Sequence, residues 1–181
     1  QKGSLVDEDH LRFDFSHYQK VSEDEIRTIE TLVNARIREN ILLDESREVP
    51  FQEALEMGAM ALFGEKYADH VRVIAFDKSY SVELCGGTHL NATGEIGLFK
   101  IVSEGAIAAG VRRIEALTGQ AAIDFYNRFL DEITEIKGFF KNTPDVVKSV
   151  KQIIEEKAGL EKDLDILKSE RINGMVSSML S

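Results

Sequence analysis

The sequence is poor in several residue types, and each shortage excludes a class of protein. Its 181 residues contain one Cys, two Pro and no Trp. A single Cys excludes an internal disulfide framework and is typical of a reducing compartment, so we expect a cytoplasmic protein. Basic residues are outnumbered, because 22 Lys plus Arg stand against 32 Asp plus Glu, and the net charge is −10. That balance excludes a polybasic protein that wraps nucleic acid, although it leaves room for a specific contact with one nucleic-acid end.

Long apolar runs and leader-like segments are missing as well. No run approaches the roughly 20 residues that span a bilayer, so we expect no membrane partner. The chain starts at Gln1 without a Met, a basic region or a signal-like segment, and we expect it to be a piece of a longer protein. Apolar residues, in contrast, make up 43% of the chain. This content suffices for a sizeable core in one domain, or in a small domain with an appendage.

Residues 1–118 mix the patterns of strands and helices. Apolar and polar residues alternate over 11–16, which predicts a strand with one buried face. Ser22 and Glu25 have the spacing of a capping box, and the apolar residues that follow at helical spacing predict a helix of about 18 residues. An extended piece that ends at Pro50 comes next, and a short helix over 51–57 follows it, with Gly58 as its C-terminal stop.

Four more strands are predicted after the short helix. Residues 71–76 and 80–85 form a hairpin through 77–79, whereas 97–104 and 110–117 are joined by a turn over 105–110. Together these patterns predict an α+β domain over residues 1–118, in which helices pack on a mixed or antiparallel sheet.

Residues 119–181 have a helical pattern throughout and form the second predicted part of the chain. One amphipathic helix should end near Gly138, and a second should begin with Thr143 as its N-cap and Pro144 in its first turn. Apolar residues of the second helix fall near heptad positions, but Lys157 and Arg171 interrupt the seam. The pattern therefore predicts a helical hairpin or stalk rather than a self-sufficient coiled coil.

The sharpest local feature is the pair Cys85 and His89. The two glycines of Cys-Gly-Gly-Thr-His argue against a helix and predict a tight loop after the second hairpin strand. A thiolate and an imidazole four residues apart can ligate one zinc ion. A zinc site needs three or four protein ligands, however, and His10, His17 and His70 show no paired spacing. Spacing alone thus leaves two interpretations of Cys85 open, a metal ligand or a small buried apolar residue.

Two weaker features also allow a functional and a structural interpretation. The small residues of 105–110 would let a ligand approach the backbone, or they form a simple hairpin turn. Because this segment lacks the Lys of a phosphate-binding loop and the spacing of a dinucleotide fingerprint, we predict no ATP or NAD site. Arg112 and Arg113 point to opposite faces of a strand, so at most one of them serves a given site. In the functional interpretation, one of the two arginines binds a phosphate. In the structural interpretation, the pair lies on a solvated face and forms one ion pair.

Six segments stand in a characteristic order along the chain: QKGSLV (residues 1–6), LRFDFSH (11–17), GAMALFGEKY (58–67), ELCGGTH (83–89), GLFKIVSE (97–104) and GVRRIEA (110–116). Over about residues 1–120 the chain closely resembles the editing domain of alanyl-tRNA synthetases. The editing domain of threonyl-tRNA synthetases shares the general fold and the metal motif, but CGGTH and GVRRIE favour the alanine enzyme. Residues 121–181 resemble, more weakly, the helical segment that leads to the C-terminal oligomerisation region of the same family.

The resemblance implies a hydrolase within a ligase. Enzymes of this family attach alanine to tRNA(Ala), using ATP and Mg in other domains, and their editing domain hydrolyses Ser-tRNA(Ala) and Gly-tRNA(Ala). Editing is needed because a pocket for alanine discriminates against Gly and Ser by only about 1–3 kcal/mol. The implied partners are the 3′ end of tRNA(Ala), the rest of the synthetase, and a second copy in a homo-oligomer formed through the C-terminal region.

The resemblance also assigns site residues. The editing zinc is held by a His-x-x-x-His pair, which would precede Gln1, together with Cys85 and His89, so we expect this chain to carry half of the ligand set. Gln1 corresponds to the family's Gln at the editing pocket, and Arg112 to a segment near it, which implies a contact with tRNA. Two alternatives remain open: a free-standing deacylase that edits in trans, and a non-catalytic helical interaction module formed by residues 119–181.

Overall fold

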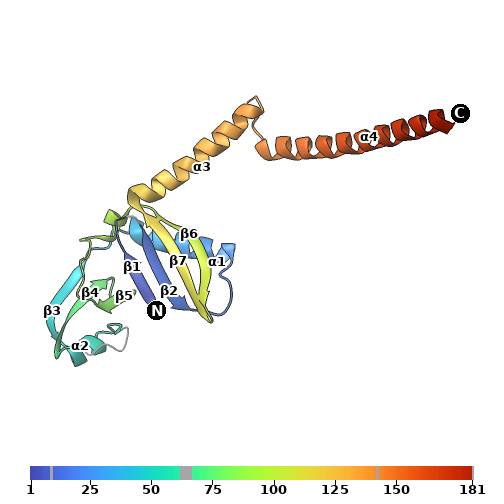
Figure 1. The fold of residues 1–181 in the computed structure, drawn as a ribbon. Coiled ribbons are helices and arrows are strands. Elements are labelled where there is room, and N and C mark those ends of the chain that lie inside the picture. Colours follow the sequence, from blue (N-terminus) through green and yellow to red (C-terminus); the bar gives the residue numbers. More distant parts are fainter. Residues whose placement is uncertain (9, 62–66, 142, 181) are drawn as a thin grey trace. The chain divides into compact units, whose positions relative to one another are not determined.

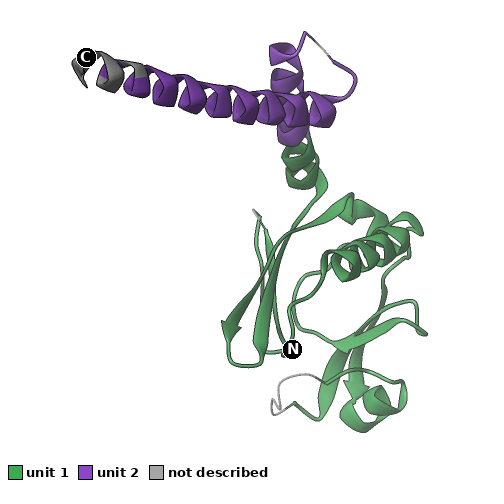
Figure 2. Ribbon diagram, turned by 90° about the vertical axis from the view of Figure 1, so that its right-hand side faces the viewer, with its two compact units in different colours: residues 1–126 green, residues 127–181 purple. Residues whose placement is uncertain are grey.

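The computed structural model describes residues 1–8, 10–61, 67–141 and 143–180, so the middle of the GAMALFGEKY motif lies outside the described residues. The chain divides into two compact units, unit 1 with residues 1–126 and unit 2 with residues 127–181 (Figure 2). The boundary predicted between 118 and 119 is the junction of β7 (Val111–Thr118) and α3 (Gly119–Phe139). Unit 1 extends past this junction into α3, where Ala122 is fully buried.

Unit 1 contains two sheets, and the larger one has the strand order β1-β2-β7-β6 with antiparallel pairing throughout (Figure 1). Its other strands are β1 (Gly3–Val6), β2 (Leu11–Ser16) and β6 (Phe99–Ala108). Helix α1 (Glu23–Arg38) packs on one face of this sheet. There Ile26 joins a core of Ile101, Ile114 and Ala116.

The smaller sheet has the order β3-β4-β5, with β3 (Asp44–Pro50), β4 (His70–Phe76) and β5 (Ser81–Leu84). Helix α2 (Phe51–Glu56) packs against β3 and β4. The core of this half consists of small and β-branched residues, namely Val49, Ala54, Ala59, Val73, Ala75 and Val82. A β-bulge interrupts the pairing of β3 with β4 between Ser46 and Val49, and such bulges re-aim side chains next to functional sites.

Helix α1 covers the open edge of strand β6. The Asn34 side chain accepts a hydrogen bond from the Phe99 N–H (2.9 Å) and donates one to the Phe99 carbonyl (2.8 Å). One turn earlier, the Glu30 carboxylate accepts the Ile101 N–H (2.8 Å) and pairs with Lys100 (2.9 Å). An uncovered edge strand invites pairing with another chain. Asn34 and Glu30 therefore take the place of a further strand and fix α1 against the sheet.

The predicted α+β class is confirmed, and so are most elements. Ser22 and Glu25 form the predicted capping box at the start of α1. β4 and β5 form the predicted hairpin. α2 ends before Gly58, whose φ of 85° is the left-handed conformation that suits glycine at a helix end.

Several details differ from the predictions. The strands are divided between two sheets, and the sequence pattern does not predict the short strand β1. Residues 105–108 continue strand β6, so the turn consists of Ala109 and Gly110 alone. The second C-terminal helix, α4 (Val146–Leu180), begins after Asp145, whose carboxylate accepts the Lys148 N–H (2.9 Å). Asp145 therefore caps α4 in place of Thr143, because the Thr143 hydroxyl accepts the Asp145 N–H instead.

Unit 2 consists of the C-terminal part of α3 and of α4. Both helices expose large apolar side chains, including Phe129 and Leu130 on α3 and Leu160 and Leu167 on α4. Among the described residues, no helix has the length and the apolar character that a membrane crossing requires.

Candidate functional site

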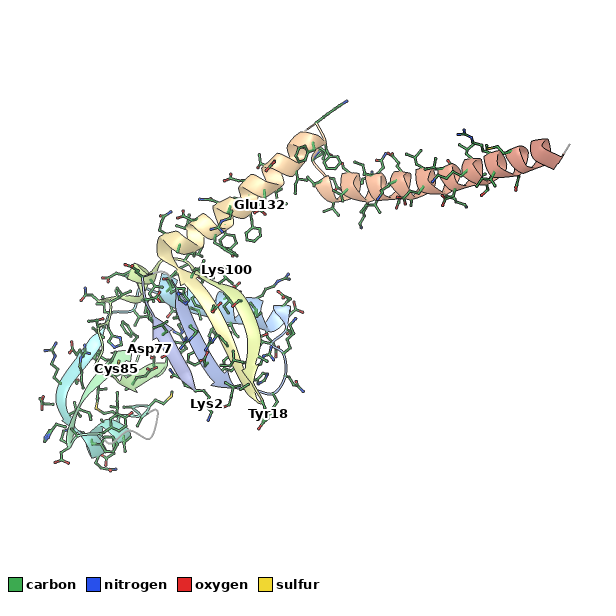
Figure 3. The ribbon with its side chains drawn as sticks, in the orientation of Figure 1. Lys2, Tyr18, Asp77, Cys85, Lys100 and Glu132 are labelled. Carbon is green, nitrogen blue, oxygen red and sulfur yellow. The ribbon has the colours of Figure 1, made fainter. Side chains whose placement is uncertain are left out.

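The loop that carries the two predicted metal ligands, residues 85–89, is called the CGGTH loop below. Cys85 follows β5 directly and is half-buried, and Figure 3 shows it beside the three-stranded sheet. Its Sγ accepts a hydrogen bond from the Gly87 N–H over 3.4 Å. His89 is exposed, and the centroid of its ring lies 6.4 Å from that of Phe76 in β4. The loop thus turns sharply after the hairpin, as predicted, and folds back towards β4.

Arg72 of β4 holds the backbone of this loop. Its Nη1 donates to the carbonyl of Cys85 over 3.1 Å and also to the carbonyl of Gly87. Its Nε donates to Oε1 of Glu45 in β3 over 2.7 Å. Arg47 donates to the same carboxylate, and the hydrogen bonds from Arg47 and then Arg72 lower the pKa of Glu45 to about 2. Sequence reasoning missed Arg72, although it is the one charged residue of an otherwise apolar run, 71–76.

A pocket of about 370 Å³ lies between α1 and the CGGTH loop, a volume typical of small-ligand sites. His89 contributes to its wall, whereas Cys85 does not. The wall is mostly apolar and comes from three regions of unit 1, namely Val33, Arg36 and Ile37 of α1, Phe76, Tyr80 and Ser81 of the β4–β5 hairpin, and the segment from Thr88 to Ile96. The sequence motif predicts a site at His89. It does not predict that Val33, Arg36 and Ile37 of α1 line the pocket.

A guanidinium group forms the charged part of the pocket wall. The Arg36 guanidinium lies over the Tyr80 ring, 4.3 Å from its centroid. It is also 2.8 Å from the Glu39 carboxylate and 3.5 Å from that of Asp77. Hydrogen bonds from Ser79 lower the pKa of Asp77, and the charge of Arg36 lowers it further. Arg36 is therefore held in place, with its cationic face against an aromatic ring.

Arg112, predicted to contact tRNA, is paired inside the protein. It forms a bidentate ion pair with Glu104 of β6, and the two side chains are only 11% and 3% exposed. The hydrogen bond from Arg112 is the main reason why the pKa of Glu104 is lowered, with smaller contributions that include the Val21 backbone at the start of α1. The pocket is lined by the C-terminal end of α1. At a rise of about 1.5 Å per residue, about 20 Å separates this end of the helix from the end near Glu104. The structure does not bring Arg112 to His89.

The neighbouring arginine has a different partner. Arg113 pairs with Asp14 of β2 through two hydrogen bonds of 2.7 and 2.9 Å. Asp14 is itself buried, and its pKa is lowered mainly by the hydrogen bond from Arg113. Arg112 and Arg113 thus both form internal ion pairs, one with β6 and one with β2. Gln1 is exposed just before β1 and does not line the pocket.

The donors on this chain fit zinc only in part. A thiolate and an imidazole are donors that zinc prefers, but a structural or catalytic zinc site has three or four protein ligands. Within the described parts of the chain, no group of three or more His, Cys, Asp and Glu side chains is placed to hold a metal ion. Cys85 and His89 would therefore hold zinc only with ligands from elsewhere.

Comparisons with known proteins show which family the chain resembles. Residues 71–115, from β4 into β7, match the family described as the threonyl and alanyl tRNA synthetase second additional domain. The chain is 53% identical over 179 residues to the alanine–tRNA ligase of Cytophaga hutchinsonii, which covers 99% of the chain and 20% of that protein. It is 53% identical over 171 residues to that of Bacteroides fragilis (94% of the chain, 19% of the protein) and 50% identical over 181 residues to that of Flavobacterium psychrophilum (100% and 20%). The resemblance to alanyl-tRNA synthetases is thus confirmed, and the chain corresponds to a part of these ligases that spans about a fifth of their length.

Proposed function

We propose that the chain is the editing domain of an alanine–tRNA ligase, followed by the start of its C-terminal helical region. The ligase attaches alanine to tRNA(Ala) with ATP and Mg, which act outside this chain. The part described here hydrolyses Ser-tRNA(Ala) and Gly-tRNA(Ala). The observation that carries the proposal is the placement of His89, because a predicted metal ligand forms part of the wall of a pocket of small-ligand size.

The chemical need for such a site follows from the substrates. A pocket that accepts alanine cannot strongly exclude glycine, which lacks one methyl group, or serine, which adds a hydroxyl. Differences of this size are worth about 1–3 kcal/mol in binding. A second site that hydrolyses the wrong ester multiplies the selectivity, and a pocket next to metal ligands suits this task.

In this proposal Cys85 and His89 hold zinc together with the two histidines that the resemblance implies. When bound, zinc would polarise the ester, generate hydroxide or orient the substrate. The residues of the chain itself orient the substrate. Phe76 and Leu90 give the pocket apolar surface against which the aminoacyl end packs. The ring of Tyr80, held by Arg36, offers an aromatic face to the 3′-terminal base.

The other two predicted site residues receive less support. Gln1 is proposed at the editing pocket only through the resemblance, since its place before β1 gives it no contact with the pocket wall. Arg112 would have to exchange Glu104 for a phosphate before it could bind tRNA. The net charge of −10 also argues that the body of the tRNA docks on other parts of the ligase.

The partners follow from this assignment. They are the 3′ end of tRNA(Ala), the remainder of the ligase and, through the helical residues 119–181, a second copy of the enzyme. We place this activity in the cytoplasm.

The test is Cys85→Ala in the full-length ligase. Clearance of Ser-tRNA(Ala) should fall by about a hundredfold or more, because several kcal/mol of transition-state stabilisation depend on an intact metal site. Alanylation of tRNA(Ala) should remain near the wild-type rate. His70→Ala is the matched control, since His70 is an exposed histidine at the start of β4. If alanylation collapsed together with clearance, Cys85 would serve the fold or the synthetic site, and the proposal would be wrong.

A further inference from the structure

We propose that Arg72 and Glu45 are positioning residues that hold the CGGTH loop in the shape in which Cys85 and His89 act. The inference deepens the proposed function and rests on it for the roles of Cys85 and His89. Glu45 of β3 and Arg72 of β4 do not line the pocket themselves.

The loop needs such support because its own residues do not fix it. Gly86 and Gly87 are consecutive, and glycine loses more conformational freedom on ordering than any other residue. A Cβ added at Gly86 would meet no atom within 4 Å, and one at Gly87 would meet only the Cys85 sulfur at 3.5 Å. Residues 86–89 are all exposed. Side-chain packing therefore gives residues 86–89 little support, although Cys85 is half-buried.

Arg72 supplies the missing restraint through the backbone. Its Nη1 donates to two loop carbonyls, those of Cys85 and Gly87, while its own carbonyl accepts the Cys85 N–H over 3.3 Å. Cys85 is thus bound to one residue through both its N–H and its C=O. A guanidinium suits this task, because its donors lie in a rigid planar fork, whereas a lysine ammonium is a point charge on a flexible stem.

Glu45 in turn fixes the guanidinium. The carboxylate accepts a hydrogen bond from Arg72 Nε over 2.7 Å. The side chains of Glu45 and Arg72 are only 23% and 24% exposed. The β-bulge in β3 lies directly opposite Arg72, since Ser46 pairs with Val73 and Val49 with Val71. This extra length of β3 includes Glu48 with a φ of 56°. The bulge leaves Arg72 without a regular partner in β3, and the Arg72 side chain bridges Glu45 and the loop.

Arg47 provides a matched control for the experiment. Its Nε also donates to the Glu45 carboxylate, but its side chain is 75% exposed and makes this hydrogen bond from outside the loop. Arg72→Met and Arg47→Met therefore each remove one guanidinium from Glu45, while only the first releases the loop. Arg72→Lys keeps the charge and removes the fork.

The first measurement is the NMR backbone order parameter of the Gly86 and Gly87 amides in the 181-residue chain. In the wild type and in Arg47→Met we expect values near those of rigid backbone, about 0.85. In Arg72→Met they should fall below about 0.6, while the amides of Ile114 and Ala116 in the larger sheet keep their values. Arg72→Lys should remain closer to Arg72→Met than to the wild type. Unchanged order parameters in Arg72→Met would overturn the proposal.

The second measurement is Ser-tRNA(Ala) clearance by the full-length ligase with the same substitutions. Arg72→Met should lower kcat by about tenfold or more, the factor for losing one charge-assisted hydrogen bond, with Arg47→Met and alanylation unaffected. The positioning role would be overturned if Arg72→Met loosened the loop but left clearance normal, while Cys85→Ala abolished clearance. If Cys85→Ala itself left clearance intact, the proposed function would fail, and the order parameters would still decide whether Arg72 holds the loop.

Discussion

Removal of the Asn34 side chain should weaken the attachment of α1 to the edge of β6. Asn34 makes two hydrogen bonds to the Phe99 backbone, of 2.8 and 2.9 Å, in a part-buried position. Each is worth about 1 kcal/mol net, and leaving the Phe99 groups unpaired tends to raise the cost. Asn34→Leu should therefore lower the free energy of unfolding of unit 1 by about 2 kcal/mol. The better helix propensity of leucine returns at most about 0.5 kcal/mol, so a net loss of about 1.5 kcal/mol or more is expected.

A urea titration followed through the NMR signals of Ile114 and Ala116 measures this loss, because both residues lie in the core of the sheet that α1 covers. Asn34→Asp keeps the acceptor for the Phe99 N–H and should cost about half as much. Thr31→Val is the control on the same helix, since Thr31 is exposed and hydrogen-bonds only within α1. A change of less than about 0.5 kcal/mol in Asn34→Leu, the range of ordinary surface substitutions, would show that side-chain pairing does not hold α1 in place.

Two further predictions concern the backbone and the charge of unit 1. Gly97→Ala should cost about 1–2 kcal/mol or more, because φ is 73° and the new Cβ would lie 3.1 Å from the Gly119 Cα, whereas Gly105→Ala should gain about 0.5–1 kcal/mol in its open strand position. Urea unfolding of both variants tests this, and a stabilised Gly97→Ala would contradict it. Glu45, with a pKa lowered from 4.5 to about 2, contributes stability above about pH 4.5 that is lost as the pH falls towards 2. Glu45→Gln should flatten the fall of stability across this window, and an unchanged slope would contradict the assignment.

Local patterns predict the elements of unit 1 well where a short stretch of sequence contains the cause. The capping box of Ser22 and Glu25 and the stop at Gly58 depend on neighbours within a few residues, and both are confirmed. The division into two sheets is not visible in the same way. It depends on β2 pairing with β7 and β3 with β4, and the first of these pairings joins Leu11 to Ala116. Alternation identifies the buried face of a strand but not its partner.

Some residues of the candidate site are likewise predictable from a local motif, and others are not. Cys85 and His89 are recognisable because their side chains carry the chemistry and lie four residues apart. Arg72 and Glu45 act through backbone carbonyls and each other, 27 positions apart in the sequence, so no local motif reveals them. The wall contributed by Val33, Arg36 and Ile37 is equally hidden, since apolar residues at helical spacing predict only that one face of α1 is covered.

Arg112 shows why a motif match and a functional role must be argued separately. Its place in GVRRIEA supports the family assignment, and its guanidinium is nevertheless occupied by Glu104 near the start of α1. Breaking such a buried pair from one side leaves an uncompensated charge, so a loss of editing in an Arg112 variant would report on folding as readily as on tRNA binding. The CGGTH loop is the opposite case, because residues 86–89 are exposed and the loop contributes no side chain to either core cluster. Since its shape depends on hydrogen bonds from Arg72, substitutions there can disturb the site and leave the fold intact, which makes this loop the better place to look for function.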